Sequence, residues 1–244
     1  MYTGGEDGVV NIFNFQGSGL QLKGKLTTID MKLSQNPSIR SIDILEDRAL
    51  IGTMGSELIL LDSIESSKAG KIIMNGHYQG ELWGLCEHPT KEELYSVGED
   101  SLLRKWSITE RSLLATLKLT DQARALTVSG NGELVAVGTV TGKIILADGQ
   151  LNHLETVQSK FTKPHQWIQD IKFSPDSQKV AFGAHGGVSK VHIYKILNKK
   201  LKFLGEINAG ITSALLHLDW DTSSNFIVLN SQAYELKFVS SESL

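Results

Sequence analysis

The sequence predicts an all-β fold built from a repeated unit, because one short pattern returns about every 40 to 47 residues. The pattern is an apolar run, a glycine with a polar turn, and a second apolar run that closes on an aromatic or aliphatic residue. Repeats of this length made of short strands are typical of a β-propeller. The copies begin at Gly5, Gly52, Gly98, Gly138 and Gly183, and a weaker last copy runs from Asn230 to Phe238.

Each repeat is expected to hold four short strands. In one complete copy we expect an inner strand over 82–87, a second over 93–97, a third over 102–107 and an outer strand over 112–118. The inner strands are nearly continuous apolar or small runs, which indicates burial on both faces. The outer strands carry more charge, as suits an exposed sheet edge.

The repeats predict about five four-stranded blades and a partial leading blade that holds a third and an outer strand. Such a set does not make a closed ring, and unclosed propellers expose strand edges. We therefore expect the chain to be a fragment of a larger tandem propeller, whose ring is closed by missing blades or by another chain. The blades belong either to one propeller or to two consecutive ones. The expected boundaries are 1–37 for the partial blade, 38–75, 76–119, 120–164 and 165–208 for the blades, and 209–244 for the incomplete last blade.

Composition favours an intracellular protein that binds neither nucleic acid nor membranes. The formal net charge is −3 with acids and bases interspersed, whereas a nucleic-acid protein shows a basic face. The densest basic stretch, residues 198–202, is expected to be a solvated hairpin edge and not a binding patch. Cys86 is the single cysteine, which fits a reducing compartment and a buried structural thiol. No apolar run approaches the roughly 18 residues of a membrane span.

One set of polar residues has the ingredients of a catalytic triad, namely His77, Ser96 and Asp100. The same residues, with Trp106, match the structural tetrad of WD-repeat blades, in which His, Ser, Asp and Trp hydrogen-bond to one another. Buried polar groups have to be paired, so such a tetrad stabilises its blade. We favour this structural interpretation. Blades that lack the tetrad are then expected to rely on packing alone.

No other residues predict a catalytic, cofactor or metal site. His185, His192 and His217 are scattered without metal-ligand spacing, and there is no second cysteine to complete a zinc site. An enzyme built on a propeller would need a cluster of acids, histidines or metal ligands in its central channel. The sequence therefore predicts a binding module that needs no cofactor or metal.

Two longer stretches resemble the echinoderm microtubule-associated protein-like family. The first is Gly-His-Tyr-Gln-Gly-Glu-Leu-Trp-Gly-Leu at 76–85, and the second is His-Leu-Asp-Trp at 217–220 followed by Asn-Ser-Gln-Ala-Tyr-Glu-Leu at 230–236. Several specific motifs in the same order are stronger evidence of a family relationship than a single motif. The residues that carry the resemblance are Glu81, Leu82, Trp83, Gly84, His217, Asp219, Trp220, Tyr234 and Glu235.

The resemblance implies a non-catalytic scaffold that binds tubulin and lies in the cytoplasm at the cytoskeleton, for example in a cilium or axoneme. The alternative is a general propeller hub for protein partners with no affinity for tubulin. Because the surface of tubulin is acidic, a binding face should gather basic side chains from several loops. The sequence offers Lys91, Lys105, Lys163 and Lys190 as candidates.

Residues 81–84 allow two interpretations. In the one we favour, Leu82 and Leu85 pack in the core, Trp83 fills the gap between blades and Gly84 permits close approach of two backbones. In the other, Glu81 and Trp83 line a binding surface at the end of the blade.

Overall fold

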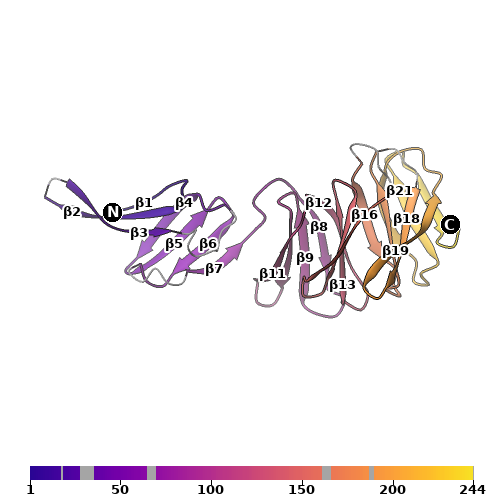
Figure 1. Ribbon diagram of the computed structural model, residues 1–244, viewed down its shortest axis with the longest axis horizontal. Coiled ribbons are helices and arrows are strands. Elements are labelled where there is room, and N and C mark those ends of the chain that lie inside the picture. Colours follow the sequence, from indigo (N-terminus) through magenta and orange to yellow (C-terminus); the bar gives the residue numbers. More distant parts are fainter. Residues whose placement is uncertain (18, 28–35, 65–69, 161–165, 187–189, 244) are drawn as a thin grey trace. The chain divides into compact units, whose positions relative to one another are not determined.

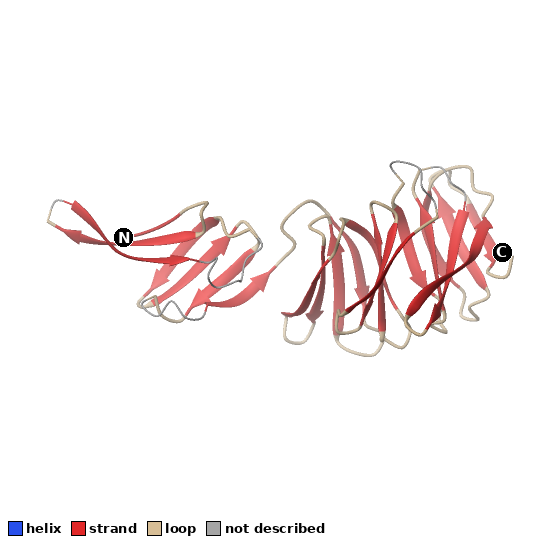
Figure 2. Ribbon diagram, viewed as in Figure 1, coloured by secondary structure: helices blue, strands red, loops and turns tan. Residues whose placement is uncertain are grey.

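The computed structural model describes residues 1–17, 19–27, 36–64, 70–160, 166–186 and 190–243 (Figure 1). In these residues the regular structure is entirely β-strand, with 22 strands in six antiparallel sheets, and Figure 2 shows strands and loops only. The all-β prediction is confirmed. The chain divides into two units, Met1–Gln79 and Gly80–Leu244.

The N-terminal unit contains two sheets. In the first, a short strand at Tyr2–Gly4 pairs with Val10–Ile12 and precedes the third and outer strands expected for this segment. Buried apolar side chains of both sheets, such as Val10, Ile51 and Ile59, form one core. The strands of the first sheet are β1 (Tyr2–Gly4), β2 (Val9–Gln16) and β3 (Gly19–Thr27), and those of the second are β4 (Ile39–Leu45), β5 (Arg48–Thr53), β6 (Glu57–Leu61) and β7 (Gly70–Asn75).

The C-terminal unit contains four sheets, each formed by strands that follow one another along the chain. The first sheet consists of β8 (Leu82–Glu87), β9 (Glu93–Gly98), β10 (Leu102–Ser107) and β11 (Ser112–Lys118). The second consists of β12 (Ala123–Val128), β13 (Leu134–Thr139), β14 (Lys143–Asp148) and β15 (His153–Gln158). The third consists of β16 (Ile168–Phe173), β17 (Lys179–Ala184), β18 (Lys190–Leu197) and β19 (Lys200–Asn208). The fourth consists of β20 (Leu215–Trp220), β21 (Phe226–Ser231) and β22 (Leu236–Ser240).

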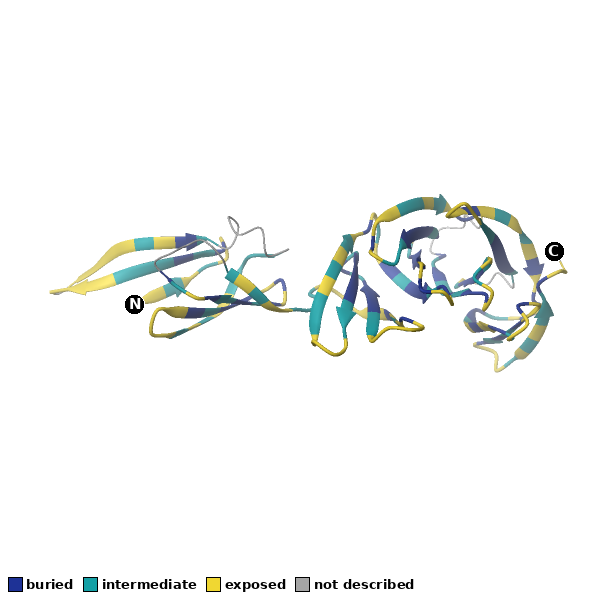
Figure 3. Cartoon of the chain, turned by 90° about the horizontal axis from the view of Figure 1, so that it is seen from below, coloured by how far each residue is buried: buried dark blue, intermediate teal, exposed yellow. Residues whose placement is uncertain are grey.

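Successive sheets of this unit pack face to face. Their first strands β8, β12, β16 and β20 are neighbours, and Figure 3 shows the sheets following one another around an arc. One buried cluster joins the first two sheets, a second joins the second and third, and another joins the third and fourth. Each cluster combines side chains of both sheets, for example Ile144 with Phe182 and Ile193 with Leu218. This arrangement of sheets is that of propeller blades.

The prediction that every inner strand is buried on both faces is wrong for β4, which has no buried residue, and for β8. Leu82 is 55% exposed and Leu85 is 69% exposed, so neither packs in the core. The physical reason is position, because the first sheet of the unit has a neighbouring sheet within the unit on one face only. Gly84 lies on the covered face, where an added Cβ would come within 2.5 Å of Val97 and 2.8 Å of Leu126. The predicted close approach at Gly84 is therefore present.

The described residues contain no helix long and apolar enough to cross a membrane.

Candidate interaction surface

Ser96 and Trp106 form a hydrogen bond inside the first sheet of the C-terminal unit. Ser96 lies on β9 and Trp106 on β10, and the indole Nε1 donates to the Ser96 hydroxyl at 2.8 Å. Asp100 lies in the turn between these strands, where its Oδ1 accepts the Leu102 backbone N–H at 3.1 Å. Its Oδ2 forms an ion pair of 2.7 Å with Arg104, a buried residue that sequence reasoning missed. His77 belongs to the N-terminal unit, so the complete tetrad stays a prediction.

These contacts argue against catalysis by Ser96 and Asp100. Both side chains are buried, and each is engaged by a neighbour on the same sheet. A nucleophile and its partners have to reach a substrate in a pocket, which a hydroxyl inside a packed sheet does not. The geometry fits a polar network that stabilises the blade.

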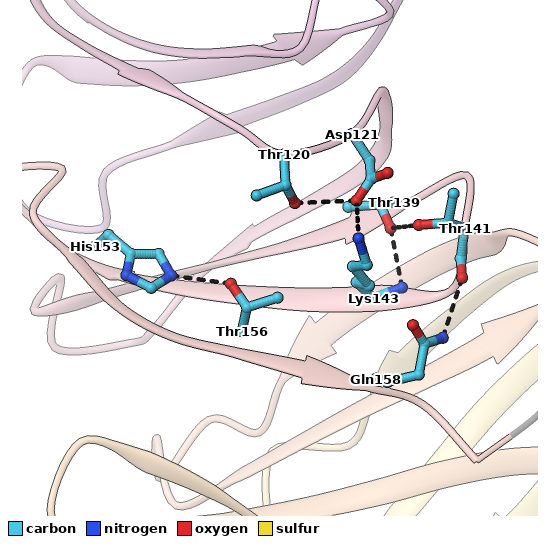
Figure 4. Close-up of polar contacts among 8 residues, drawn as sticks. All are labelled: Thr120, Asp121, Thr139, Thr141, Lys143, His153, Thr156 and Gln158. Carbon is cyan, nitrogen blue, oxygen red and sulfur yellow. Dashed lines mark hydrogen bonds and ion pairs between the residues drawn. The ribbon is translucent and has the colours of Figure 1, made fainter.

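The second sheet has a polar network of its own, so the expectation that other blades rely on packing alone is wrong. The ammonium group of Lys143 forms an ion pair of 2.7 Å with Asp121, and its backbone N–H donates to the Thr139 hydroxyl at 2.9 Å (Figure 4). Gln158 donates to the Thr141 carbonyl at 3.1 Å. Burial raises the pKa of Asp121, but hydrogen bonds from Lys143 and Thr120 outweigh burial and lower it.

A stack of flat side chains joins three successive sheets where their first strands begin. The guanidinium of Arg124, on β12, lies 4.2 Å from the Trp83 ring and 4.8 Å from the Trp167 ring. The Trp167 ring stacks in turn on His185 at 4.0 Å, with 6° between the ring planes. We call Trp83, Arg124, Trp167 and His185 the stacked ladder. A guanidinium between two indole faces is a favourable cation–π arrangement.

Hydrogen bonds fix the orientation of the ladder. Glu99, in the β9–β10 turn, accepts from Arg124 Nη2 at 3.1 Å and from Trp83 Nε1 at 3.2 Å. Trp167 Nε1 donates to Gln169 at 2.7 Å. Burial, and then the charge of Arg124, lowers the pKa of His185, which favours the neutral form of this outer ring of the ladder.

Trp83 keeps an open side in this arrangement. It is 44% exposed, and the neighbouring Glu81 is exposed as well. Sequence reasoning missed the partners of Trp83, although Arg124 occupies the same second position of its own inner strand. An aromatic residue and a cationic residue at equivalent positions of successive repeats could have predicted this contact.

The residues of the C-terminal motifs at 217–220 and 230–236 have different environments. Trp220 is buried, and its Nε1 donates to the Lys172 carbonyl at 3.1 Å. Asp219 caps the backbone N–H of Trp220 at 2.8 Å, and Glu235 accepts from Ser231 Oγ at 2.6 Å. These three side chains stabilise the last sheet. Tyr234 and His217 are largely exposed instead.

A cavity of about 290 Å³ lies beside His217, between β16 and the last sheet. Asp170 lines it, accepts the Leu218 N–H at 3.0 Å and lies 3.8 Å from His217 Nδ1. Burial raises the pKa of Asp170. Among the described residues no group of three or more acids, histidines or cysteines could hold a metal ion.

The predicted lysine candidates do not form one basic face. Lys105 is buried, with its ammonium group 3.0 Å from Glu93 and 3.0 Å from the Gly149 carbonyl. Lys190 is paired with Glu206, and Lys91 is exposed on the β8–β9 turn. Lys163 lies outside the described residues.

The C-terminal unit matches a known family. Residues 82–244 match the family model described as the echinoderm microtubule-associated protein second β-propeller. The chain belongs to this family. The match covers all four sheets of the unit, and with them Trp83, Arg124 and Trp167 of the stacked ladder.

Curated members of the echinoderm microtubule-associated protein family agree with this assignment. The chain is 32% identical to echinoderm microtubule-associated protein-like 2 of Rattus norvegicus over 192 residues. This alignment covers 79% of the chain and 28% of the relative. The chain is 28% identical over 199 residues to echinoderm microtubule-associated protein-like 3 of Homo sapiens, covering 78% of the chain and 21% of the relative. The chain thus spans less than a third of the length of these family members.

A solved structure supports the fold. A chain in a structure titled "Crystal Structure of Mitotic Checkpoint Complex" is similar with a TM-score of 0.59 over 98% of this chain and 70% of that chain. At 15% identity the likeness concerns architecture only.

Proposed function

We propose that this chain is a non-catalytic interaction module that associates with microtubules through tubulin. The observation that carries the proposal is the family match over residues 82–244. It is supported by relatives whose names describe them as microtubule-associated. The proposed place of action is the cytoplasmic cytoskeleton, including that of a cilium or axoneme.

The absence of catalysis is part of the proposal. Two of the three residues most like a triad, Ser96 and Asp100, are buried and engaged by side chains of their own sheet. The C-terminal unit offers rigid surfaces to a partner where its polar side chains are fixed by ion pairs and stacking, as at Lys143 and Arg124. Binding to a preformed surface costs little ordering entropy, which suits a scaffold.

Ring closure forms a second part of the proposal. In the described residues the last sheet has three strands, and one of its faces has no neighbouring sheet in its unit. Exposed apolar blade faces and free strand edges favour contact with another sheet. We infer that further blades, or another chain, cover this face when the ring closes.

Co-sedimentation with stabilised microtubules over a salt series tests the association. We expect saturable pelleting that weakens as salt rises, because contacts between exposed charges are screened by ions. The chain alone, spun at each salt concentration, is the control for aggregation. A folded, monodisperse sample that stays in the supernatant at low salt would contradict tubulin binding and favour a general protein-interaction hub.

A further inference from the structure

Lysines from three neighbouring strands line up across the third sheet of the C-terminal unit. Lys179 on β17 pairs directly with Lys195 on β18, and Lys195 pairs directly with Lys202 on β19. Directly opposite residues lie on the same face of a sheet, and so do residues two apart on one strand, which adds Lys200. Lys199 follows at the hairpin turn. We call Lys179, Lys195, Lys199, Lys200 and Lys202 the lysine row.

The row lies mostly in solvent. Lys199, Lys200 and Lys202 are exposed, and Lys195 is half-buried. Lys179 is also half-buried, and its ammonium group lies 3.2 Å from Ser241 Oγ and 3.4 Å from the Ser224 carbonyl. The inner end of the row is therefore anchored on the last sheet, while the outer end is free to bind.

The lysine row has no ion pair with any described carboxylate, in contrast to Lys105, Lys143 and Lys190. Two acids beside β19 or the 198–199 turn, Glu155 and Asp148, already accept hydrogen bonds from other groups. Glu155 accepts the Leu201 backbone N–H at 2.6 Å. Burial raises the pKa of Asp148, but hydrogen bonds from Asn152 and Gln150, and then the charge of Lys199, lower it.

Such a row is unfavourable for the free protein. Like charges directly opposite one another on a sheet destabilise the pairing. Here two such pairs follow each other, Lys179 with Lys195 and Lys195 with Lys202. Carboxylates from outside would relieve this repulsion. The sequence shows only the run at 198–202 and not Lys179 and Lys195, which the strand register places beside it.

The spacing fits an extended acidic peptide. Neighbouring strands are about 4.8 Å apart, so three strands carry the row across roughly 10 Å. Side chains on one side of an extended peptide repeat at about 7 Å, which brings two or three carboxylates over the row. Leu197, opposite Lys200 and 42% exposed, offers an apolar contact beside them. Nucleic acid fits less well, since a chain of net charge −3 lacks a wide basic face.

We propose that the lysine row is the surface on which this chain takes a glutamate-rich segment of tubulin. This assignment rests on the proposed association with microtubules. The row supplies charge-assisted contacts to carboxylates. It would also steer the encounter with an acidic surface.

Two matched variants of the full chain test the assignment. The row variant carries Lys195→Gln, Lys199→Gln, Lys200→Gln and Lys202→Gln and leaves Lys179 in place, because Lys179 contacts the last sheet. The control variant removes four positive charges from other elements, with Arg48→Gln, Arg111→Gln, Lys118→Gln and Lys237→Gln. Both change the net charge equally, and urea unfolding followed by tryptophan fluorescence shows whether each is folded.

Binding is measured to microtubules by co-sedimentation and to labelled poly-L-glutamate by fluorescence anisotropy, with poly-L-lysine as the negative probe. We expect the row variant to bind both acidic partners at least about tenfold more weakly and the control variant to remain within about twofold of the parent chain. The salt dependence of the row variant should be shallower, because fewer charges take part.

The outcomes separate the two proposals. If the parent chain and both variants pellet with microtubules equally, the proposal that the lysine row binds tubulin is wrong, while microtubule association itself is supported. A parent chain that does not pellet would overturn microtubule association, and with it tubulin as the partner of the row. Equal loss in both variants would also overturn the row, since net charge alone would then explain the binding.

Discussion

Gly84 shows how tightly single residues are confined where two sheets of the C-terminal unit meet. A Cβ at this position would lie 2.5 Å from Val97 Cγ1 and 2.8 Å from the Leu126 Cβ. The Leu126 contact is close to the backbone and cannot rotate away. We expect Gly84→Ala to lower the free energy of unfolding by about 1–3 kcal/mol, as overpacked cores do. Urea denaturation measures the change.

Leu85 is the matched control, because it is next in sequence and exposed. We expect Leu85→Ala to change the free energy of unfolding by less than about 0.5 kcal/mol, as is usual for surface positions. A loss of several kcal/mol at Leu85, with little effect at Gly84, would restore the core packing that the sequence predicts for this leucine.

His192 makes the stability of the C-terminal unit depend on pH. It is buried, stacks on Phe182 at 5.2 Å, and lies 3.9 Å from a Glu206 oxygen. Burial lowers the pKa of His192 to about 4, while the charge of Glu206 opposes this and that of Lys190 adds to it. Between pH 6.5, near the ordinary pKa of histidine, and pH 4, His192 is therefore protonated in the unfolded chain but not in the folded chain.

The stabilisation is complete above about pH 6.5 and is lost as pH falls toward 4. We expect His192 to account for about 2–3 kcal/mol of lost stability between pH 7.5 and 4.5. All four tryptophans lie in the C-terminal unit, so their fluorescence in urea reports its unfolding. His192→Phe keeps a ring against Phe182 and should lose correspondingly less stability on acidification. Equal losses in the parent and the variant would rule out this role of His192.

At the scale of elements, the stacked ladder joins sheets whose described residues form no backbone–backbone hydrogen bonds with one another. We expect Trp83→Ala to lower the free energy of unfolding by about 1–2 kcal/mol, because Arg124 loses one of its two ring partners and Glu99 loses a donor. Trp83→Phe keeps a ring and should cost less. A double-mutant cycle with Arg124→Gln isolates the coupling. Unchanged stability with weakened microtubule pelleting would identify Trp83 as a contact residue and not a link between sheets.

The strands were predictable because their signals are local. The turn at 98–101 and the apolar runs beside it predict β9 and β10, and both strands are present over nearly those residues. The partners of Trp83 were not predictable in this way. Arg124 and Trp167 lie about one and two repeats further along the chain, and only the packing of sheets brings them together. Arg104 is only four residues from Asp100, but the local pattern does not show that a charged side chain at this position of β10 is fully buried.

At the scale of the molecule, the last sheet leaves an apolar face uncovered within its unit. The strand register places Phe226, Val228, Leu236 and Phe238 on this face. Phe226 is 51% exposed, Leu236 is 64% exposed and Phe238 is 72% exposed. The opposite face carries Ile227 and packs in the core. Contiguous exposed apolar side chains favour association with a further surface.

We therefore expect the chain to self-associate as its concentration rises, and the double variant Leu236→Lys, Phe238→Lys to suppress this without loss of stability. Sedimentation velocity over a concentration series measures it. The matched control, Gln232→Lys with Ala233→Lys, adds the same charge in the exposed β21–β22 turn. If both variants suppress association equally, net charge and not the apolar face would govern it. If neither does, association does not proceed through this sheet, and closure of the ring has to be sought at another edge.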